Sequence, residues 1–277
     1  MHIQPSKLCR TVVVLADIHA GSSKGLLPPE FINLEDIAIP QNPMQVWLWE
    51  CWIRTLGSVN EIMNGDPYAL VLNGDMIEGV HHGTKEIISP EVGDHKRAAV
   101  QILKPLSDGA VKTFVVRGTE CHVGTQELSI AESLGAVINP ESPAGNRAFQ
   151  RLTLDIAGVR CVFRHHISAS VRRSLSATQL SLALAEEQLE AANNGEKIPR
   201  VVCAAHRHRW GFFQDDNGQC IVSPCWQFLT NHGHKVVSPA RTKPGLFILD
   251  WRNRADSELP EVIPIQFRAP EPKALSL

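Results

Sequence analysis

The chain has 277 residues, of which 43% are hydrophobic and 20% are charged, proportions that are ordinary for a globular protein with a large core. Its formal net charge of -2 gives no overall attraction to nucleic acid or to an anionic membrane, so any such contact must be local. The seven cysteines are scattered and include no CxxC pair, which argues against a disulfide framework and for reduced thiols. Because no secretory signal and no apolar run of about eighteen residues is present, we expect a soluble, cytoplasmic protein without a membrane partner.

The first predicted strand begins at Val12 and runs into Asp17 and His19. Its apolar, β-branched residues are typical of a buried parallel strand, and ligands gather where such strands end. Alternate residues of a strand lie on one face, so the two polar side chains can point into a common site. Residues 20–43 form a loop that we expect to be ordered and packed on the body, and apolar spacing then predicts a helix from Pro43 to Met63.

Two further strands end in polar residues in the same way. Tyr68 to Leu72 runs into Asn73-Gly74-Asp75, and Val111 to Val116 breaks at the stretch from Gly118 to His122. Between these strands, Asp94 is expected to cap a helix that reaches about Leu106, with an irregular last turn at Pro105. A helix over 125–134 follows. Alternating strands and helices of this kind predict an α/β fold.

The second half of the sequence is rich in strands and has one long helix. A hairpin over 150–156 and 159–163 leads to His165-His166, and a strand over 200–205 delivers His206-Arg207-His208. The long helix spans 176–192, and short strand-like runs fill the rest of the chain. No polar linker separates the halves, so we expect one domain over residues 1–277 with two packed sheets.

The polar residues at these strand ends are all carboxylates or imidazoles. They are Asp17, His19, Asp75, Glu120, His122, His165, His166, His206 and His208. Oxygen and nitrogen ligands without sulfur suit Mn, Fe, Zn, Ni or Co. The set exceeds what one tetrahedral ion needs, which favours two metal ions that share a carboxylate, most naturally that of Asp75. A pair of ions about 3.5–4 Å apart is the arrangement that phosphoester hydrolysis favours.

The order of these blocks resembles the calcineurin-like metallophosphoesterase superfamily. The blocks are Asp17-x-His19, Gly74-Asp75, Gly118-x-x-x-His122, His165-His166 and His206-x-His208, and the resemblance covers roughly residues 12–208. It implies a four-layer α-β-β-α sandwich with two mixed β-sheets. It also implies two divalent ions, with Mn²⁺ expected first, and a hydroxide between them that attacks phosphorus in line.

Carried over by position, the resemblance assigns a role to each block. Asp17, His19 and His208 would hold the first ion, and Asp75 would bridge to the second, making it both a ligand and a catalytic residue. His206 and either His165 or His166 would complete the second ion, and the sequence leaves that choice open.

The third block departs from the family pattern Gly-Asn-His. Glu120 in the place of the Asn, with one residue gained before the catalytic His122, is the preferred alignment, and Thr119 in that place is the alternative. The Gly-Thr-Glu-x-His block is similar to those of stand-alone phage and prophage members, which favours Glu120.

Three further residues are candidates for substrate binding. His82 follows the second block and could bind the phosphate, and Arg172 and Arg173 follow the fourth block with side chains suited to phosphate. The resemblance and these local arginines favour an enzyme that hydrolyses phosphodiesters, with DNA or a nucleotide as substrate. A phosphomonoesterase is the enzymatic alternative, and a non-catalytic, metal-binding interaction scaffold on the same fold is the alternative outside enzymes.

Overall fold

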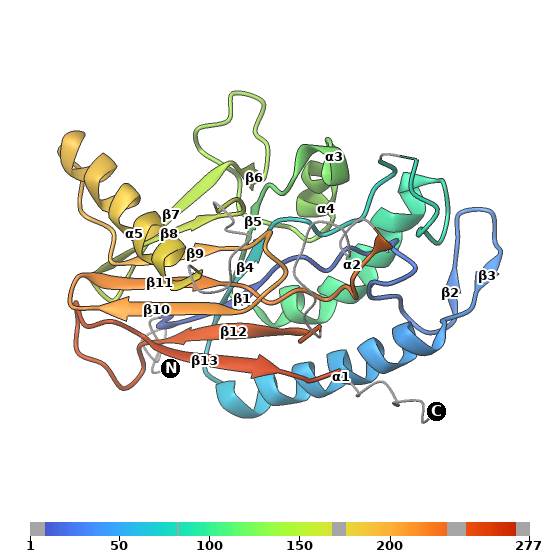
Figure 1. Ribbon diagram of the computed structural model, residues 1–277, viewed down its shortest axis with the longest axis horizontal. Helices are drawn as coiled ribbons and strands as arrows, with labels where there is room; N and C mark the ends of the chain where they lie inside the picture. Colours follow the sequence, from blue (N-terminus) through green and yellow to red (C-terminus); the bar gives the residue numbers. More distant parts are fainter. Residues whose placement is uncertain (1–8, 82, 168–175, 232–241, 270–277) are drawn as a thin grey trace, which may run out of the picture.

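A mixed, six-stranded sheet is one of the two large sheets at the centre of the molecule (Figure 1). The computed structural model describes residues 9–81, 83–167, 176–231 and 242–269. Strands β1, β4, β5 and β6 of this sheet are parallel, and β12 and β13 extend it in antiparallel pairing beyond β1. Their bounds are Thr11–Leu15 (β1), Ala69–Asn73 (β4), Lys112–Val116 (β5), Ala148–Phe149 (β6), Gly245–Asp250 (β12) and Glu261–Gln266 (β13).

A second, five-stranded sheet has the order β10-β11-β9-β8-β7. Its bounds are Arg151–Ile156 (β7), Val159–Arg164 (β8), Val201–Ala204 (β9), Gly211–Asp215 (β10) and Gly218–Val222 (β11). Strand β9 pairs in parallel with β8 and β11, and β7 and β10 close the sheet as hairpin partners. The predicted hairpin over 150–163 is therefore confirmed.

The core has an inner layer between the two sheets and an outer layer on each side. Val12 and Val14 of β1 pack in one buried cluster with Phe163 and Cys203 of the second sheet, so the sheets lie face to face. The alternate residues Val13 and Leu15 face helices α1 and α2 on the other side. Helix α5 covers the outer face of the second sheet. The predicted four-layer α-β-β-α sandwich with two mixed sheets is confirmed.

The helices are α1 (Pro43–Met63), α2 (Val92–Gly109), α3 (Glu120–Val123), α4 (Gln126–Ser133) and α5 (Ser176–Asn193). Helix α1 has the predicted bounds because Asn42 and Gln45 form a capping box and Asn64 ends it in the left-handed conformation. The predicted cap of α2 is wrong. Asp94 lies inside the first turn, where its carboxylate accepts the backbone N–H of Leu34, and Glu91 takes the cap position.

Residues 20–43 pack on the body, as expected, because Leu26 and Leu27 are fully buried. This segment also contains a short hairpin of β2 (Phe31–Ile32) and β3 (Ala38–Ile39) that the sequence did not predict. Among the described helices, none combines the length and hydropathy that crossing a membrane requires. The parallel pairing of β1, β4 and β5, and of β8 and β9, places the polar ends of all five strands at one edge of the two sheets.

Candidate metal centre

Left-handed backbone turns direct the polar side chains inward at this edge. Asp17, His19, Asp75, His206 and His208 all have positive φ, between 45° and 69°. The turns after β1 and β4 lie side by side, because the N–H of Asp17 donates to Gly74 O at 3.0 Å and that of His19 donates to Asp75 O at 3.1 Å. Positive φ is uncommon outside glycine and is concentrated at functional sites. The five residues therefore form one polar centre on a constrained backbone, as is typical of a functional site.

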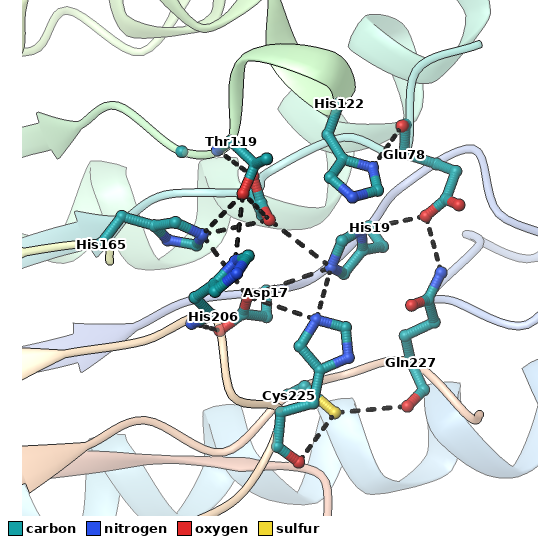
Figure 2. A network of polar contacts seen from close by, with 12 residues as sticks. Asp17, His19, Glu78, Thr119, His122, His165, His206, Cys225 and Gln227 are labelled. Carbon is teal, nitrogen blue, oxygen red and sulfur yellow. Dashed lines mark hydrogen bonds and ion pairs between the residues drawn. The ribbon is translucent and has the colours of Figure 1, made fainter. Parts of the chain in front are cut away.

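The first group of side chains consists of Asp17, His19 and His208. Figure 2 labels Asp17 and His19 of this group. The Nε2 atoms of the two histidines lie 3.0 Å apart, and Asp17 Oδ1 lies 3.5 Å from that of His208 and 3.9 Å from that of His19. Asp17 and His19 are almost completely buried. Asp17 Oδ2 accepts the backbone N–H of His206, whereas Oδ1 is buried and has no hydrogen-bond partner among the described residues. Such an orphaned carboxylate oxygen facing two imidazole nitrogens is what a divalent cation would satisfy.

The second group consists of Asp75, His165, Thr119 and His206. Asp75 Oδ2 lies 3.1 Å from His165 Nε2 and accepts the hydroxyl of Thr119 at 3.2 Å. The Thr119 hydroxyl also lies 3.1 Å from Nδ1 of His206. His165 directs Nε2 toward the group because its Nδ1 donates to the carbonyl of Asn73 at 2.8 Å. Asp75 Oδ2 also lies 4.0 Å from His19 Nε2, so its carboxylate stands between the two groups.

Glu120 does not join this centre, and its predicted place is taken by Thr119. The carboxylate of Glu120 is exposed and pairs with Arg117 at 3.0 Å. Thr119 instead donates its backbone N–H to Asp75 Oδ1 at 2.6 Å and directs its hydroxyl inward. Gly118 allows this close approach, since a Cβ there would lie 2.2 Å from the backbone N of Asp75. Glu120 is the first residue of α3, and the turn of the helix points its side chain outward.

His165 and His166 are both near the second group but differ in burial. His165 is buried and contacts Asp75, whereas His166 is exposed and packs edge-on against His206, with ring centroids 4.7 Å apart. One ligand atom from each of His165, His166 and His206 can be chosen so that all three lie within 4.8 Å. His165 is thus the inner candidate and His166 a candidate at the rim.

The charges of the centre are strongly coupled. Burial raises the pKa of Asp17 to about 7, partly offset by the charge of His165. Burial alone would also raise that of Asp75, but the hydrogen bond and charge of His165 hold its pKa well below the ordinary range. Burial opposes protonation of His19, yet the hydrogen bond and charge of Glu78 raise its pKa to about 9. Burial, followed by the charge of His19, lowers the pKa of His208 to about 3. Carboxylates and imidazoles forced together in this way fit bound cations.

A second layer of buried polar residues orients the first. Glu78 Oε2 lies 2.9 Å from His19 Nδ1, which directs Nε2 of that ring toward His208. The amide of Gln227 donates to Glu78 Oε2 at 2.6 Å, and no signal in the sequence pointed to it. Glu127 of α4 was also missed. Its carboxylate accepts the N–H of Met76 at 3.2 Å and that of Gly118 at 2.6 Å, so it joins the loops after β4 and β5.

His122, the predicted catalytic histidine, lies beside His19 of the first group. Its ring centroid is 4.9 Å from that of His19, and its Nδ1 lies 2.9 Å from the carbonyl oxygen of Glu78 (Figure 2). Burial, followed by the charge of His19, lowers its pKa. The three candidates for substrate binding, His82, Arg172 and Arg173, lie outside the described residues.

Comparisons with known proteins find likeness in structure alone. No family profile matches the chain, and no curated protein matches it. Among solved structures, an archaeal phosphodiesterase is similar at 13% identity with a TM-score of 0.44, covering 93% of this chain and 99% of that one. Vps29 from Entamoeba histolytica in complex with Zn²⁺ is similar at 13% identity with a TM-score of 0.40, covering 93% and 98%.

A protein from Streptococcus pneumoniae described as a predicted phosphoesterase is similar at 12% identity with a TM-score of 0.34, covering 92% of this chain and 97% of that one. At these identities and TM-scores, the similarity does not show that this chain has the activity or the ligand of any of these proteins.

Proposed function

We propose that this chain is a phosphoesterase of the calcineurin-like kind that uses two divalent metal ions to hydrolyse phosphodiester bonds. The observation that carries the proposal is the position of Asp75. Its Oδ2 lies 3.1 Å from Nε2 of His165 in one group of ligands and 4.0 Å from Nε2 of His19 in the other. One buried carboxylate between two sets of imidazoles is the arrangement expected for a pair of ions that act on one phosphoryl group.

The residues divide into two ligand sets. Asp17, His19 and His208 would hold the first ion, and Thr119, His165 and His206 would hold the second, with Asp75 shared between them. When bound, the ions would polarise the phosphoryl group and supply hydroxide near neutral pH. Manganese is the ion proposed first because the resemblance implies it, and the oxygen and imidazole ligands of both sets suit it as they suit Fe, Zn, Ni or Co. A hydroxyl in place of an amide makes the second set the weaker one.

His122 is proposed to give a proton to the leaving oxygen. Its Nδ1 is engaged by the carbonyl of Glu78, so its Nε2 is the nitrogen that can exchange a proton with substrate. The lowered pKa of His122 reflects burial and the positive charge of His19. A bound phosphodiester anion opposes both effects and favours the protonated ring. His122 can therefore hold a proton at Nε2 when the substrate is in place.

The substrate class proposed is a nucleic acid or nucleotide. This part of the proposal rests on the resemblance in the sequence blocks, since the net charge of -2 gives no global attraction to polyanions. Arg164, which precedes the fourth block, forms an ion pair with Glu187 of α5 at 3.2 Å. Its charge is therefore neutralised within the fold, and we do not assign it to substrate binding.

Hydrolysis of bis-p-nitrophenyl phosphate, compared with the monoester p-nitrophenyl phosphate, tests the proposal after chelation and restoration with Mn²⁺. We expect activity that returns with the metal and prefers the diester. A preference for the monoester would replace the diester assignment with a phosphomonoesterase. If neither substrate is hydrolysed with Mn²⁺, Ni²⁺, Fe²⁺ or Zn²⁺, the catalytic proposal fails and the interaction scaffold takes its place.

A further inference from the structure

A second cluster of metal-binding side chains lies beside the centre, and two of its three members, His81 and Cys121, have no role in the proposed mechanism. One ring nitrogen each of His81 and His122 and the Sγ of Cys121 lie within 4.8 Å of one another. The rings of the two histidines pack edge-on with centroids 4.2 Å apart. Unlike the ligand sets that share Asp75, this cluster contains sulfur. Imidazole and thiolate are both ligands that Zn²⁺ uses in proteins, at about 2.0–2.1 Å for nitrogen and 2.3 Å for sulfur.

Glu78 holds both histidines of the cluster in place. Its Oε1 lies 3.1 Å from His81 Nε2, and its backbone carbonyl lies 2.9 Å from His122 Nδ1. A carboxylate or carbonyl on one ring nitrogen is the usual partner of a histidine that binds metal, because it fixes the ring and makes the ligand more basic. Within the described residues, that carbonyl is the hydrogen-bond partner of the His122 ring, so Nε2 carries the lone pair of the neutral ring.

The loop of His81 and helix α3, which supply the cluster, are fixed against each other. Gly79, at φ +68°, follows Glu78, and a Cβ at this position would lie 2.0 Å from the carbonyl oxygen of His122. The backbone of the loop therefore touches the backbone of the helix. This contact keeps His81 beside Cys121 and His122 before any ion arrives, which lowers the ordering cost of binding.

Cys121 is suited to take part because it can be reached. All seven cysteines lie in described parts of the chain and are free thiols, and Cys121 alone is exposed. The exposed thiol can move toward an ion by rotation about one bond, and binding must displace its proton, as at other thiolate sites.

We propose that His81, Cys121 and His122 form a third metal site, which takes Zn²⁺ and inhibits the enzyme. The inhibitory effect rests on the proposed function, because an ion on Nε2 of His122 would occupy the nitrogen that gives a proton to the leaving oxygen. The existence of the site does not depend on that function. Zinc would thus act at two places with opposite effects. Bound by the catalytic ligand sets it would support hydrolysis, and bound by the third site it would block His122.

Cobalt absorption tests the site without reference to activity. A thiolate bound to Co²⁺ gives a charge-transfer band in the near ultraviolet, which oxygen and imidazole ligands do not give. We expect the band in the wild-type chain and in Cys9→Ser, which removes a half-buried control thiol two residues before β1. Cys121→Ser and Cys121→Ala should lose it. A band of equal size in the Cys121 variants, or no band in the wild type, would overturn the site.

Inhibition by Zn²⁺ tests the effect on activity. With the protein loaded with Mn²⁺, Cys121→Ser should retain its hydrolysis of bis-p-nitrophenyl phosphate, and the Zn²⁺ concentration that halves activity should rise by at least about tenfold. Manganese content is measured in the same samples, so that displacement of the catalytic ions is seen directly. Equal inhibition of wild type and Cys121→Ser would contradict the inhibitory role. If the wild type shows the cobalt band but no hydrolysis with any metal, the proposed function fails while the site stands.

Discussion

The Nε2 atoms of His19 and His208 lie 3.0 Å apart, although 189 residues separate the two histidines in the sequence. One follows β1 of the first sheet and the other follows β9 of the second, so the centre exists only where the two sheets meet. Each ring is turned by a positive φ at its own residue. Two imidazole nitrogens held this close beside the carboxylate of Asp17 repel or compete for one proton unless a cation lies between them.

Thr119 and Glu120 can be distinguished as ligands by paired substitutions. Thr119→Ala removes the hydroxyl that contacts Asp75, His165 and His206, and we expect affinity for the second Mn²⁺ to fall by about 10–100-fold. Glu120→Gln should leave both affinities unchanged, because its carboxylate is exposed and faces Arg117. Titration of the metal-free variants with Mn²⁺ measures both. The opposite pattern would restore Glu120 to the site.

His122→Gln tests proton transfer to the leaving group. A sugar hydroxyl leaves poorly without a proton, so kcat on a dinucleotide diester should fall by about 10²–10⁴-fold. Loss on bis-p-nitrophenyl phosphate should be much smaller, because p-nitrophenolate leaves readily as an anion. The comparison of kcat between the two substrates is the measurement. Equal losses on both would show that His122 orients substrate or metal and does not act as the acid.

Metal affinity should depend on pH through His19 and His165. Both have a pKa raised to about 9 from 6.5: burial opposes the shift, but contacts with Glu78 and Asp75 prevail. In the metal-free protein their protonation therefore stabilises the fold below pH 6.5, and this contribution is lost as pH rises through about 9.

An ion requires the neutral rings and must displace these protons. Affinity for Mn²⁺ should therefore rise by about tenfold per pH unit for each proton displaced, up to about pH 9. Competition with a chelator of known affinity measures it, and calorimetry in two buffers counts the protons released. Affinity that stays constant from pH 6.5 to 9 would refute this coupling.

Glu127→Gln should loosen the second ligand set. The amide would place a donor opposite one of the backbone N–H groups of Met76 and Gly118, which should lower the free energy of unfolding by about 1–3 kcal/mol. Because these loops carry Asp75 and Thr119, affinity for the second ion should also fall. Glu132→Gln, an exposed position on the same helix, is the matched control for thermal unfolding and Mn²⁺ titration. Equal thermal stability and equal Mn²⁺ affinity of the two variants would show that Glu127 does not support the second ligand set.

The sequence predicted the strands that carry the site better than the individual side chains within it. The apolar runs before Asp17, Asp75 and His206 identify buried strands, and their abrupt polar ends identify the edge where the ligands lie. The preference for Glu120 over Thr119 does not match the positions of the two side chains, because these depend on where helix α3 begins and on the contact of Gly118 with Asp75. Neither feature is visible in residue types alone.

The second layer was the hardest part to predict, because its residues are far apart in the sequence. Gln227 meets Glu78 across 149 residues and Glu127 meets Met76 across 51, and neither pair forms a local motif. The hairpin of β2 and β3 was missed for a different reason. Its two-residue strands are too short to show alternation, and they are held by tertiary contacts, the burial of Phe31 and the hydrogen bond of Leu34 to Asp94.

The number of ions bound by the wild type and by Asp75→Asn tests the central claim most directly. The metal-free proteins are equilibrated with Mn²⁺, the bound ions are counted by elemental analysis, and hydrolysis of bis-p-nitrophenyl phosphate is measured on the same samples. We predict two ions for each wild-type chain, no more than one in Asp75→Asn, and activity reduced by more than about 100-fold. Two ions and unchanged hydrolysis in Asp75→Asn would contradict the account.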